Sequence, residues 1–259
     1  MVTVPYLSRI RINPLRAHAR QLLGNPQALH AAVLGGIAVQ PVTERVLWRV
    51  DSDDPHRPLL YVLTDSRPDW NHLVEQAGWP DADGDHAQVR DYAPLLARIA
   101  VGREFAFRLT ANPVQCSRTP TKRTTSQEAR ARNGGLTRGY RLGHRTVGHQ
   151  LGWLLDRTTG WGFTIPDAQT GRPAPGMTND ESLTAAPAKD VRITARARWC
   201  FTRHRGAPPV VLHTATYAGQ LIVTDADLLR DKLLAGIGPG KAYGCGLLTL
   251  ATASHPADG

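Results

Sequence analysis

The sequence predicts an α+β fold of two tandem ferredoxin-like domains, each with the element order β-α-β-β-α-β. Two observations favour this class. Strand-like segments that alternate apolar and polar side chains are interspersed with segments of helical periodicity, and this element order occurs twice along the 259 residues. A stretch rich in Thr, Arg, Gly and Ser separates the two occurrences. We therefore expect one domain over residues 1–115, a basic linker or binding loop over 116–137, and a second domain over 138–259.

The first unit begins with a strand, because apolar and polar residues alternate over Tyr6–Asn13. Asn25 is a favourable N-cap and Pro26 suits the first helical position, so a helix is expected from there to the glycine pair at 35–36. An acidic loop with Pro and Gly precedes the last strand. The remaining two strands, short helix and last strand are expected over Val46–Asp51, Leu59–Asp65, Asp69–Ala77 and Arg103–Asn112.

The second unit begins with a short strand near Arg138–Leu142, followed by a helix over about Arg145–Arg157. A Pro- and Gly-rich loop then leads to two strands, a helix that Asp225 caps, and a final strand. These three strands are expected over Val191–Thr202, Pro209–Val223 and Leu247–Ala251. The two halves share this element order but no visible sequence repeat.

The composition excludes several classes of protein. A hydrophobic content of 41% with 20% charged residues rules out a mainly disordered chain. No apolar run reaches the roughly 18 residues of a membrane span, so no membrane association is expected. Cys116, Cys200 and Cys245 form no C-x-x-C pair, which argues against a disulfide framework or a zinc site. The first residues do not look like a secretion signal, and we expect a cytoplasmic protein.

The positive charge is confined to one half of the chain. Lys and Arg number 31 against 22 Asp and Glu, a net charge of +9. Residues 1–115 hold 12 arginines and 12 acids, whereas residues 116–259 hold 19 basic residues and 10 acids, and 19 − 10 = +9 is the whole excess. Between Arg118 and Arg145 there are eight basic residues and one acid, Glu128. Clustered arginine of this kind indicates a polyanionic partner such as nucleic acid, the alternative being a solvated basic face.

A glycine-rich run follows the last predicted helix. It departs from a Walker A loop at Ala235 and Ala242, and it follows a helix, whereas a dinucleotide-binding fingerprint precedes one. Its glycines allow the backbone to approach a ligand closely and to point N–H groups at phosphate, and Lys241 adds a positive charge. The alternative is a helix end and hairpin without a ligand. The glycines concerned are Gly236, Gly238, Gly240, Gly244 and Gly246.

His30 is the candidate for proton transfer. It shares a helix face with Gln27 and Leu34, beside the apolar stripe that we expect in the core. Imidazole titrates near neutral pH and can exchange a proton without a metal, although a single histidine can also be an ordinary surface residue. No metal site is predicted, because the aspartates near residues 51–54 and 81–85 fall in apparent loops and are best explained as solvated turn residues.

The predicted strand over Val191–Thr202 has two different faces. Strict alternation puts apolar side chains on one face and arginines on the other. Phosphate contact is one interpretation of the arginine face, and an edge strand protected by charge is the alternative. The apolar set is Val191, Ile193, Ala195, Ala197, Trp199 and Phe201, and the opposite set is Arg192, Thr194, Arg196, Arg198 and Cys200.

Several of these motifs together resemble the CasE family, the crRNA-processing endoribonucleases of type I-E CRISPR (Cascade) systems. The matching features, which span nearly the whole chain, are Tyr6–Ile10, Asn25-Pro26 followed by His30, Phe107–Pro113 and the G-h-G-x5-G-h-G run at 236–246. The resemblance implies two RRM-like domains that bind the CRISPR repeat RNA hairpin and cleave it at its 3′ base without metal or cofactor. It also implies that the protein stays on the crRNA with other Cascade subunits.

The resemblance maps the family's catalytic histidine onto His30. The 2′-OH would attack the adjacent phosphate, giving a 2′,3′-cyclic phosphate and a 5′-OH, and this step needs a proton acceptor, a proton donor and stabilisation of the phosphorane charge. His30 could be the acceptor or the donor. Some family members carry tyrosine one turn earlier, where this chain has Gln27, which cannot act as acid or base. Tyr243 is a possible assisting residue.

Basic residues of the second half would hold the RNA stem, because guanidinium groups bind phosphates in bidentate fashion. A non-catalytic RNA-hairpin-binding subunit, with His30 idle, is the alternative function. The expected RNA-binding residues are Arg118, Lys122, Arg123, Arg130, Arg132, Arg138, Arg141, Arg192, Arg196, Arg198 and Lys241.

Overall fold

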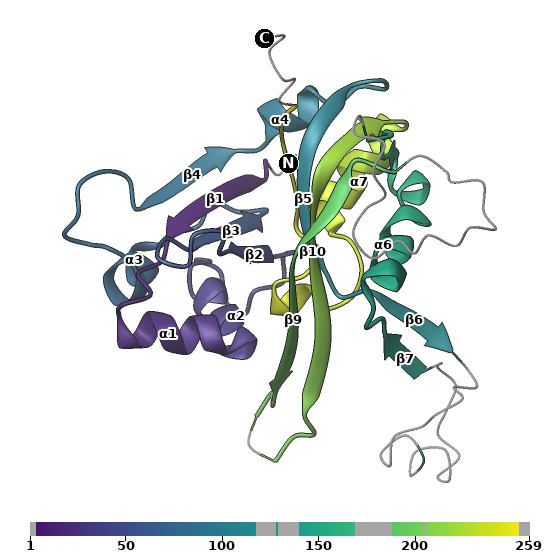
Figure 1. Cartoon of the computed structure of the whole chain (residues 1–259). Helices are drawn as coiled ribbons and strands as arrows, with labels where there is room; N and C mark the ends of the chain where they lie inside the picture. The colour runs from purple at the N-terminus through teal and green to yellow at the C-terminus, as the bar shows by residue number, and fades with distance from the viewer. Residues whose placement is uncertain (1–3, 118–127, 129–139, 169–187, 205, 254–259) are drawn as a thin grey trace.

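The computed structural model describes residues 4–117, 128, 140–168, 188–204 and 206–253. The fold is mixed α+β, as expected, with two larger sheets side by side and a separate two-stranded hairpin (Figure 1). One sheet and its helices come from the N-terminal part of the chain. The β9–β10 pair of the other sheet projects beyond the body of the molecule, between α2 and the hairpin (Figure 1).

The first sheet has the strand order β2-β3-β1-β4, with every pair antiparallel. Its strands are β1 (Tyr6–Arg11), β2 (Leu47–Asp51), β3 (Leu59–Thr64) and β4 (Ala87–Asp91), and its helices are α1 (Ala17–Gly24), α2 (Pro26–Leu34) and α3 (Asn71–Ala77). Ile10 and Val62 of the sheet pack with Leu29 and Val33 of α2 in one apolar core. The predicted cap of α2 is confirmed, because Asn25 Oδ1 accepts a hydrogen bond from the Gln27 N–H at 3.0 Å.

The prediction that Arg103–Asn112 completes the first sheet is wrong. That segment is β5 (Glu104–Ala111), and it pairs with β10 and β11 of the second sheet. The first sheet is completed by β4, which lies where an acidic loop was expected and has no fully buried residue, so its sequence carries little apolar alternation. The sheets therefore divide between β4 and β5, whereas the domain limits themselves stay a prediction.

The second sheet has the order β11-β5-β10-β8, and β9 also pairs with β10. Its remaining strands are β8 (Phe163–Thr164), β9 (Val191–Phe201), β10 (Val210–Val223) and β11 (Leu248–Thr252). The helices α6 (Val147–Leu155) and α7 (Ala226–Ala235) share the core of this sheet, where Leu109 and Tyr217 pack with Leu151 and Leu229. The chain also contains α4 (Ala93–Ala97) and the short helical turns η1 (Thr159–Trp161) and η2 (Lys241–Tyr243).

The strand expected near Arg138–Leu142 does not belong to this sheet. It is β7 (Tyr140–Gly143), and it pairs with β6 (Val114–Ser117) as a separate hairpin. The prediction that it begins the second sheet is wrong, because β5 occupies that place between β10 and β11. A four-residue strand has too few alternating positions to reveal from the sequence which partner it pairs with.

A β-bulge in β9 divides the face that the sequence assigned to the arginines. Ala195 pairs with Thr216, but Tyr217 pairs with Ile193, so Thr194 is an extra residue without a partner in the register. An extra residue inverts the alternation on either side of it. Arg192 therefore lies on the opposite face of β9 from Arg196 and Arg198, and the prediction of a single arginine face is wrong.

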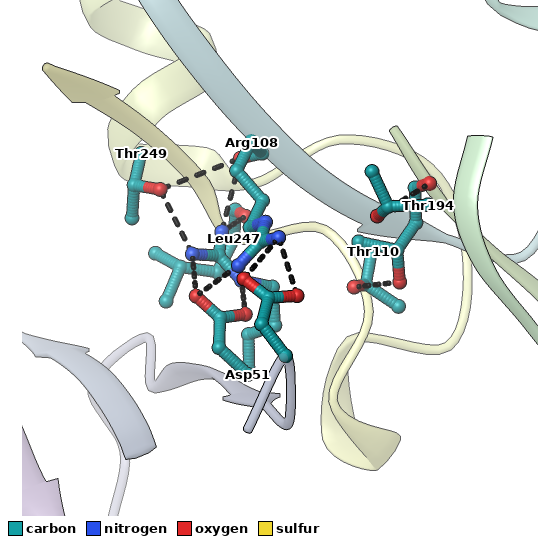
Figure 2. A network of polar contacts seen from close by, with 9 residues as sticks. Asp51, Arg108, Thr110, Thr194, Leu247 and Thr249 are labelled. Carbon is teal, nitrogen blue, oxygen red and sulfur yellow. Dashed lines mark hydrogen bonds and ion pairs between the residues drawn. The ribbon is translucent and has the colours of Figure 1, made fainter. Parts of the chain in front are cut away.

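A buried arginine joins the two sheets. Arg49 of β2 is 2% exposed and binds the Asp51 carboxylate through two nitrogens, at 2.6 and 2.9 Å. Its Nη1 donates to the carbonyls of Arg108 at 2.9 Å and Leu247 at 3.0 Å (Figure 2). Arg108 also pairs with Asp51, at 3.3 Å, and with Asp53, at 2.6 Å. The expectation that the first aspartate group consists of solvated turn residues is therefore wrong for Asp51, which is part of this ionic network.

Candidate active site and nucleic-acid interface

His30 lies where α2 packs against the glycine-rich loop. Its ring centroid is 6.5 Å from that of Tyr243 in η2, with the planes at 66°. Tyr243 in turn makes an edge contact with Phe201 at the end of β9, at 4.7 Å between centroids. Gln27 is one helical turn before His30, and both are half-buried. The structure thus brings together the three residues that the sequence singled out for catalysis.

The environment of His30 favours its neutral form. Burial lowers the pKa of His30 below its usual 6.5. Its Nδ1 is buried and has no hydrogen-bond partner among the described residues. Nδ1 is thus closed to solvent, and the ring as a whole is half-buried. At neutral pH this imidazole is therefore ready to accept a proton.

The glycines of the loop are required by its backbone. All five have positive φ angles, between +73° at Gly238 and +92° at Gly246. A Cβ at Gly244 would lie 2.7 Å from the ring of Trp48, and one at Gly246 would lie 2.7 Å from the carbonyl oxygen of Ile237. Several loop N–H groups donate to carbonyls of the protein, including that of Gly246 to Thr110 at 2.7 Å. The amides that make these bonds are not available for phosphate. The absence of side chains at the glycines lets the loop pack tightly against Trp48 and β5.

A positive charge cluster lies beside this loop. Burial, followed by the charges of Arg45 and Lys232, lowers the pKa of Lys241. Arg45 and Lys232 are thus each close enough to repel Lys241, and a phosphate group would relieve that repulsion. Sequence analysis found Lys241 and missed Arg45 and Lys232, because Arg45 lies in the electrically neutral half and neither belongs to a local basic run.

A cleft of about 600 Å³ borders Tyr243. One wall is formed by α1, α2 and β2, including Trp48, and the opposite wall by β9 and β10, including Trp199. Thr194 and Thr216 supply hydroxyl groups to its lining. The aromatic side of the projecting β9–β10 pair therefore faces this cleft and Tyr243.

The predicted RNA-binding arginines have different surroundings. Arg192, Arg196 and Arg198 are exposed on β9. Arg196 is partly held by the protein itself, because its Nε donates to the Gln150 side chain at 2.8 Å and its Nη2 donates to the Arg145 carbonyl. Arg141 lies in β7. Six further residues lie outside the described part of the chain: Arg118, Lys122, Arg123, Arg130, Arg132 and Arg138.

The described residues contain neither a membrane-spanning helix nor a cluster of metal ligands. No helix among them is long and apolar enough to cross a membrane. In the same ranges, no group of three or more His, Cys, Asp and Glu side chains is placed to hold a metal ion.

The fold and this site define a CRISPR-associated protein. The family model described as "CRISPR associated protein" matches residues 5–252, and the chain belongs to that family. Within it, the chain is a member of the Cse3/CasE (Cas6e) endoribonucleases of the type I-E Cascade system, which confirms the resemblance seen in the sequence.

Two curated relatives support this assignment. CRISPR-associated endoribonuclease Cse3 of Thermus thermophilus is 27% identical over 252 residues, covering 95% of this chain and 99% of the relative. The Cascade subunit CasE of Escherichia coli K12 is 26% identical over 203 residues, covering 76% and 85%.

Solved structures show the same fold. Thermus thermophilus Cse3 bound to an RNA representing a pre-cleavage complex has a TM-score of 0.66 and 25% identity, covering 96% of this chain and 99% of the other. Cas6e of Escherichia coli K-12 has a TM-score of 0.55 and 21% identity, covering 96% and 100%.

Proposed function

We propose that this protein is a metal-independent endoribonuclease that binds the CRISPR repeat hairpin and cleaves precursor crRNA at the hairpin's 3′ base. The observation that carries this proposal is the position of His30, half-buried against Tyr243 and beside the cationic cluster around Lys241, in a member of the Cse3/CasE family. Proton transfer and phosphate binding are thereby available within one site.

In this mechanism His30 is the general base. Its lowered pKa leaves it neutral at pH 7, so Nε2 accepts the proton of the 2′-OH as that oxygen attacks the adjacent phosphorus. The bond from phosphorus to the 5′ oxygen breaks, and that oxygen takes up a proton from water while His30 later releases its own to the solvent. The products are a 2′,3′-cyclic phosphate and a 5′-OH. Lys241 and Arg45 are suited to stabilise the phosphorane charge, and Gln27 is suited to orient the 2′-OH by hydrogen bonding.

The architecture suits RNA binding by two ferredoxin-like, RRM-like domains. The order β2-β3-β1-β4 is that of one antiparallel ferredoxin-like sheet, with α2 and α3 as its helices. The set β5, α6, β9, β10, α7 and β11, with the spatial order β11-β5-β10-β9, repeats it. We therefore propose a domain boundary between β4 and β5, a revision of the division expected at residue 115.

The basic residues of the second half would hold the hairpin stem, including the six expected residues that lie outside the described chain. The family assignment favours a protein that remains on its product with other Cascade subunits, in the cytoplasm. One structure with a similar fold is that of a CRISPR RNA-guided surveillance complex before nicking. Its TM-score is 0.57 and its identity to this chain is 20%.

The proposal is tested by incubating the protein with its host's repeat RNA in EDTA under single-turnover conditions between pH 6 and pH 8. A 5′-OH product and a 2′,3′-cyclic phosphate, identified by mass spectrometry, are expected. His30→Ala should slow cleavage by about 100-fold or more while still binding the hairpin. His18→Ala, which removes an exposed histidine of α1, is the matched control and should cleave normally.

RNA that stays intact with the wild-type protein would favour the second candidate, a non-catalytic RNA-hairpin-binding subunit. Gln27, which cannot transfer a proton, is the residue that favours that alternative.

A further inference from the structure

Three histidines gather at the start of α6, on the opposite side of the β9–β10 pair from His30. The rings of His144 and His149 stack with centroids 5.8 Å apart and planes at 26°. The hydroxyl of Thr146 lies 2.7 Å from Nδ1 of His149. His213 of β10 faces the end of β7, where a Cβ at Gly143 would lie 3.1 Å from its ring. We call His144, His149 and His213 the histidine cluster.

The charges that act on the histidine cluster are positive. Burial is the main cause that lowers the pKa of His144, and His149 and Arg157 lower it further. Burial likewise lowers the pKa of His213, with Arg145 and Arg198 as additional causes. Both histidines are therefore neutral at pH 7. A negative charge placed between these histidines and the arginines would raise the pKa of both histidines and favour their protonation.

The groups that surround the cluster come from α6 with its flanking residues and from β9. Arg145 and Arg157 flank α6, and Arg196 and Arg198 project from β9, with Arg198 directly opposite His213 in the strand register. Gln150 fixes the arrangement, because its Nε2 donates to the His144 carbonyl at 3.0 Å and its Oε1 accepts from Arg196.

The cluster also lies at the base of the β6–β7 hairpin (Figure 1). His144 directly follows β7, and its N–H donates to the carbonyl of Pro113, directly before β6, at 2.9 Å. The sequence between Ser117 and Tyr140 contains six of the expected RNA-binding residues. The cluster therefore lies where β6 begins and β7 ends.

We propose that His144, His149 and His213 form a phosphate-binding subsite for the RNA stem, and that His144 and His213 take up protons when the stem binds. The proposal rests on the proposed function, since it assumes the same RNA ligand. A phosphate oxygen between the cluster and Arg198 would stabilise imidazolium and receive charge-assisted hydrogen bonds. By linkage, affinity for RNA then rises as the pH falls, by up to about tenfold per pH unit for each proton taken up.

The direction of this effect follows from the two states. In the free protein His144 and His213 are neutral at pH 7 to 8, and their protonation there is opposed by burial and by the neighbouring arginines. In the complex the phosphate raises their pKa values. Binding therefore tightens over the interval between the free and bound pKa values, and it does not change with pH above that interval.

The test measures hairpin affinity between pH 5.5 and pH 8.0 at constant ionic strength, by fluorescence anisotropy. The probe is the repeat hairpin with a 2′-deoxy nucleotide at the cleavage position, so no strand is cut. The wild-type protein should bind at least about tenfold more tightly at pH 6 than at pH 8. The triple variant H144Q/H149Q/H213Q should lose most of this difference, while the control H18Q/H56Q, which changes two exposed histidines, should keep it.

His149→Lys gives a second, independent readout at an exposed position. A fixed positive charge should tighten binding at pH 8 and flatten the pH dependence. Titration calorimetry in two buffers of different ionisation enthalpy should show net proton uptake by the wild-type protein and less by the triple variant. An unchanged pH dependence in the triple variant, or no proton uptake by the wild type, would overturn the proposal.

The outcomes separate this proposal from the proposed function. Because the probe cannot be cleaved, a wild-type protein that binds it with the expected pH dependence but leaves ordinary repeat RNA intact would refute only the endoribonuclease. Cleavage without any pH-dependent binding would refute only the histidine subsite. Failure to bind the hairpin at any pH would refute both.

Discussion

Replacing Gly244 by alanine should damage the active site through the backbone of the glycine-rich loop. Gly244 has φ +77°, and a Cβ there would lie 2.7 Å from the ring of Trp48, which is 3% exposed. A left-handed conformation costs a residue other than glycine roughly 1–2 kcal/mol. Displacing a buried ring from a close-packed site costs roughly a further 1–3 kcal/mol. The expected loss of unfolding free energy is therefore about 2–5 kcal/mol.

Gly102→Ala is the matched control for this prediction. Gly102 also has a positive φ, +81°, but its Cβ would meet no atom within 4 Å. It should lose only the backbone contribution of roughly 1–2 kcal/mol. The difference between the two variants therefore isolates the contact with Trp48.

The assay combines urea unfolding with single-turnover cleavage of the repeat hairpin. Gly244 directly follows Tyr243, which contacts the ring of His30, so a shift of the loop should also slow cleavage by Gly244→Ala. Gly102→Ala should cleave at the wild-type rate under conditions in which it is folded. Equal unfolding free energies for the two variants would refute the reasoning about the Trp48 contact, and unimpaired cleavage by Gly244→Ala would refute the link to His30.

Three further predictions concern single side chains. Arg49→Met should lower the unfolding free energy measured in urea titrations by about 3–5 kcal/mol, because Asp51 loses its main partner in a buried site. The control Arg98→Met, at an exposed position, should change the unfolding free energy little. With His30 as the general base, the single-turnover rate at saturating protein should rise with pH and then level off; a rate that falls as pH rises would make His30 the acid instead. Lys241→Ala should lower that rate by about 100-fold, and Lys189→Ala, at a surface pair with Asp167, should leave it unchanged.

Local features of the sequence predicted the start of α2 and the backbone of the glycine-rich loop well. The cap at Asn25 fixes where α2 begins and therefore which face His30 occupies. The glycine spacing identified a loop whose backbone only glycine adopts easily. Both features depend on residues a few positions apart, which is the range over which sequence patterns determine structure directly.

Features that depend on distant partners could not be predicted in this way. The alternation over Arg103–Asn112 correctly indicated a strand, and Phe105 and Phe107 of β5 are buried, but alternation is the same whichever sheet the strand joins. The cluster of Arg45 and Lys232 with Lys241 joins three separate segments, so no window of sequence contains it. The role of Arg49 between the sheets was hidden for the same reason.

The bulge at Thr194 shows how much one residue in a strand can decide. Beyond it, Trp199 and Phe201 face the cleft and Tyr243, while Arg198 faces His213 on the other side. With strict alternation, the arginine would face Tyr243 and the aromatic rings would face α6, because a one-residue slip exchanges the two faces of a strand. The bulge therefore lets one pair of strands place aromatic side chains against Tyr243 and, on its other face, Arg198 beside His213.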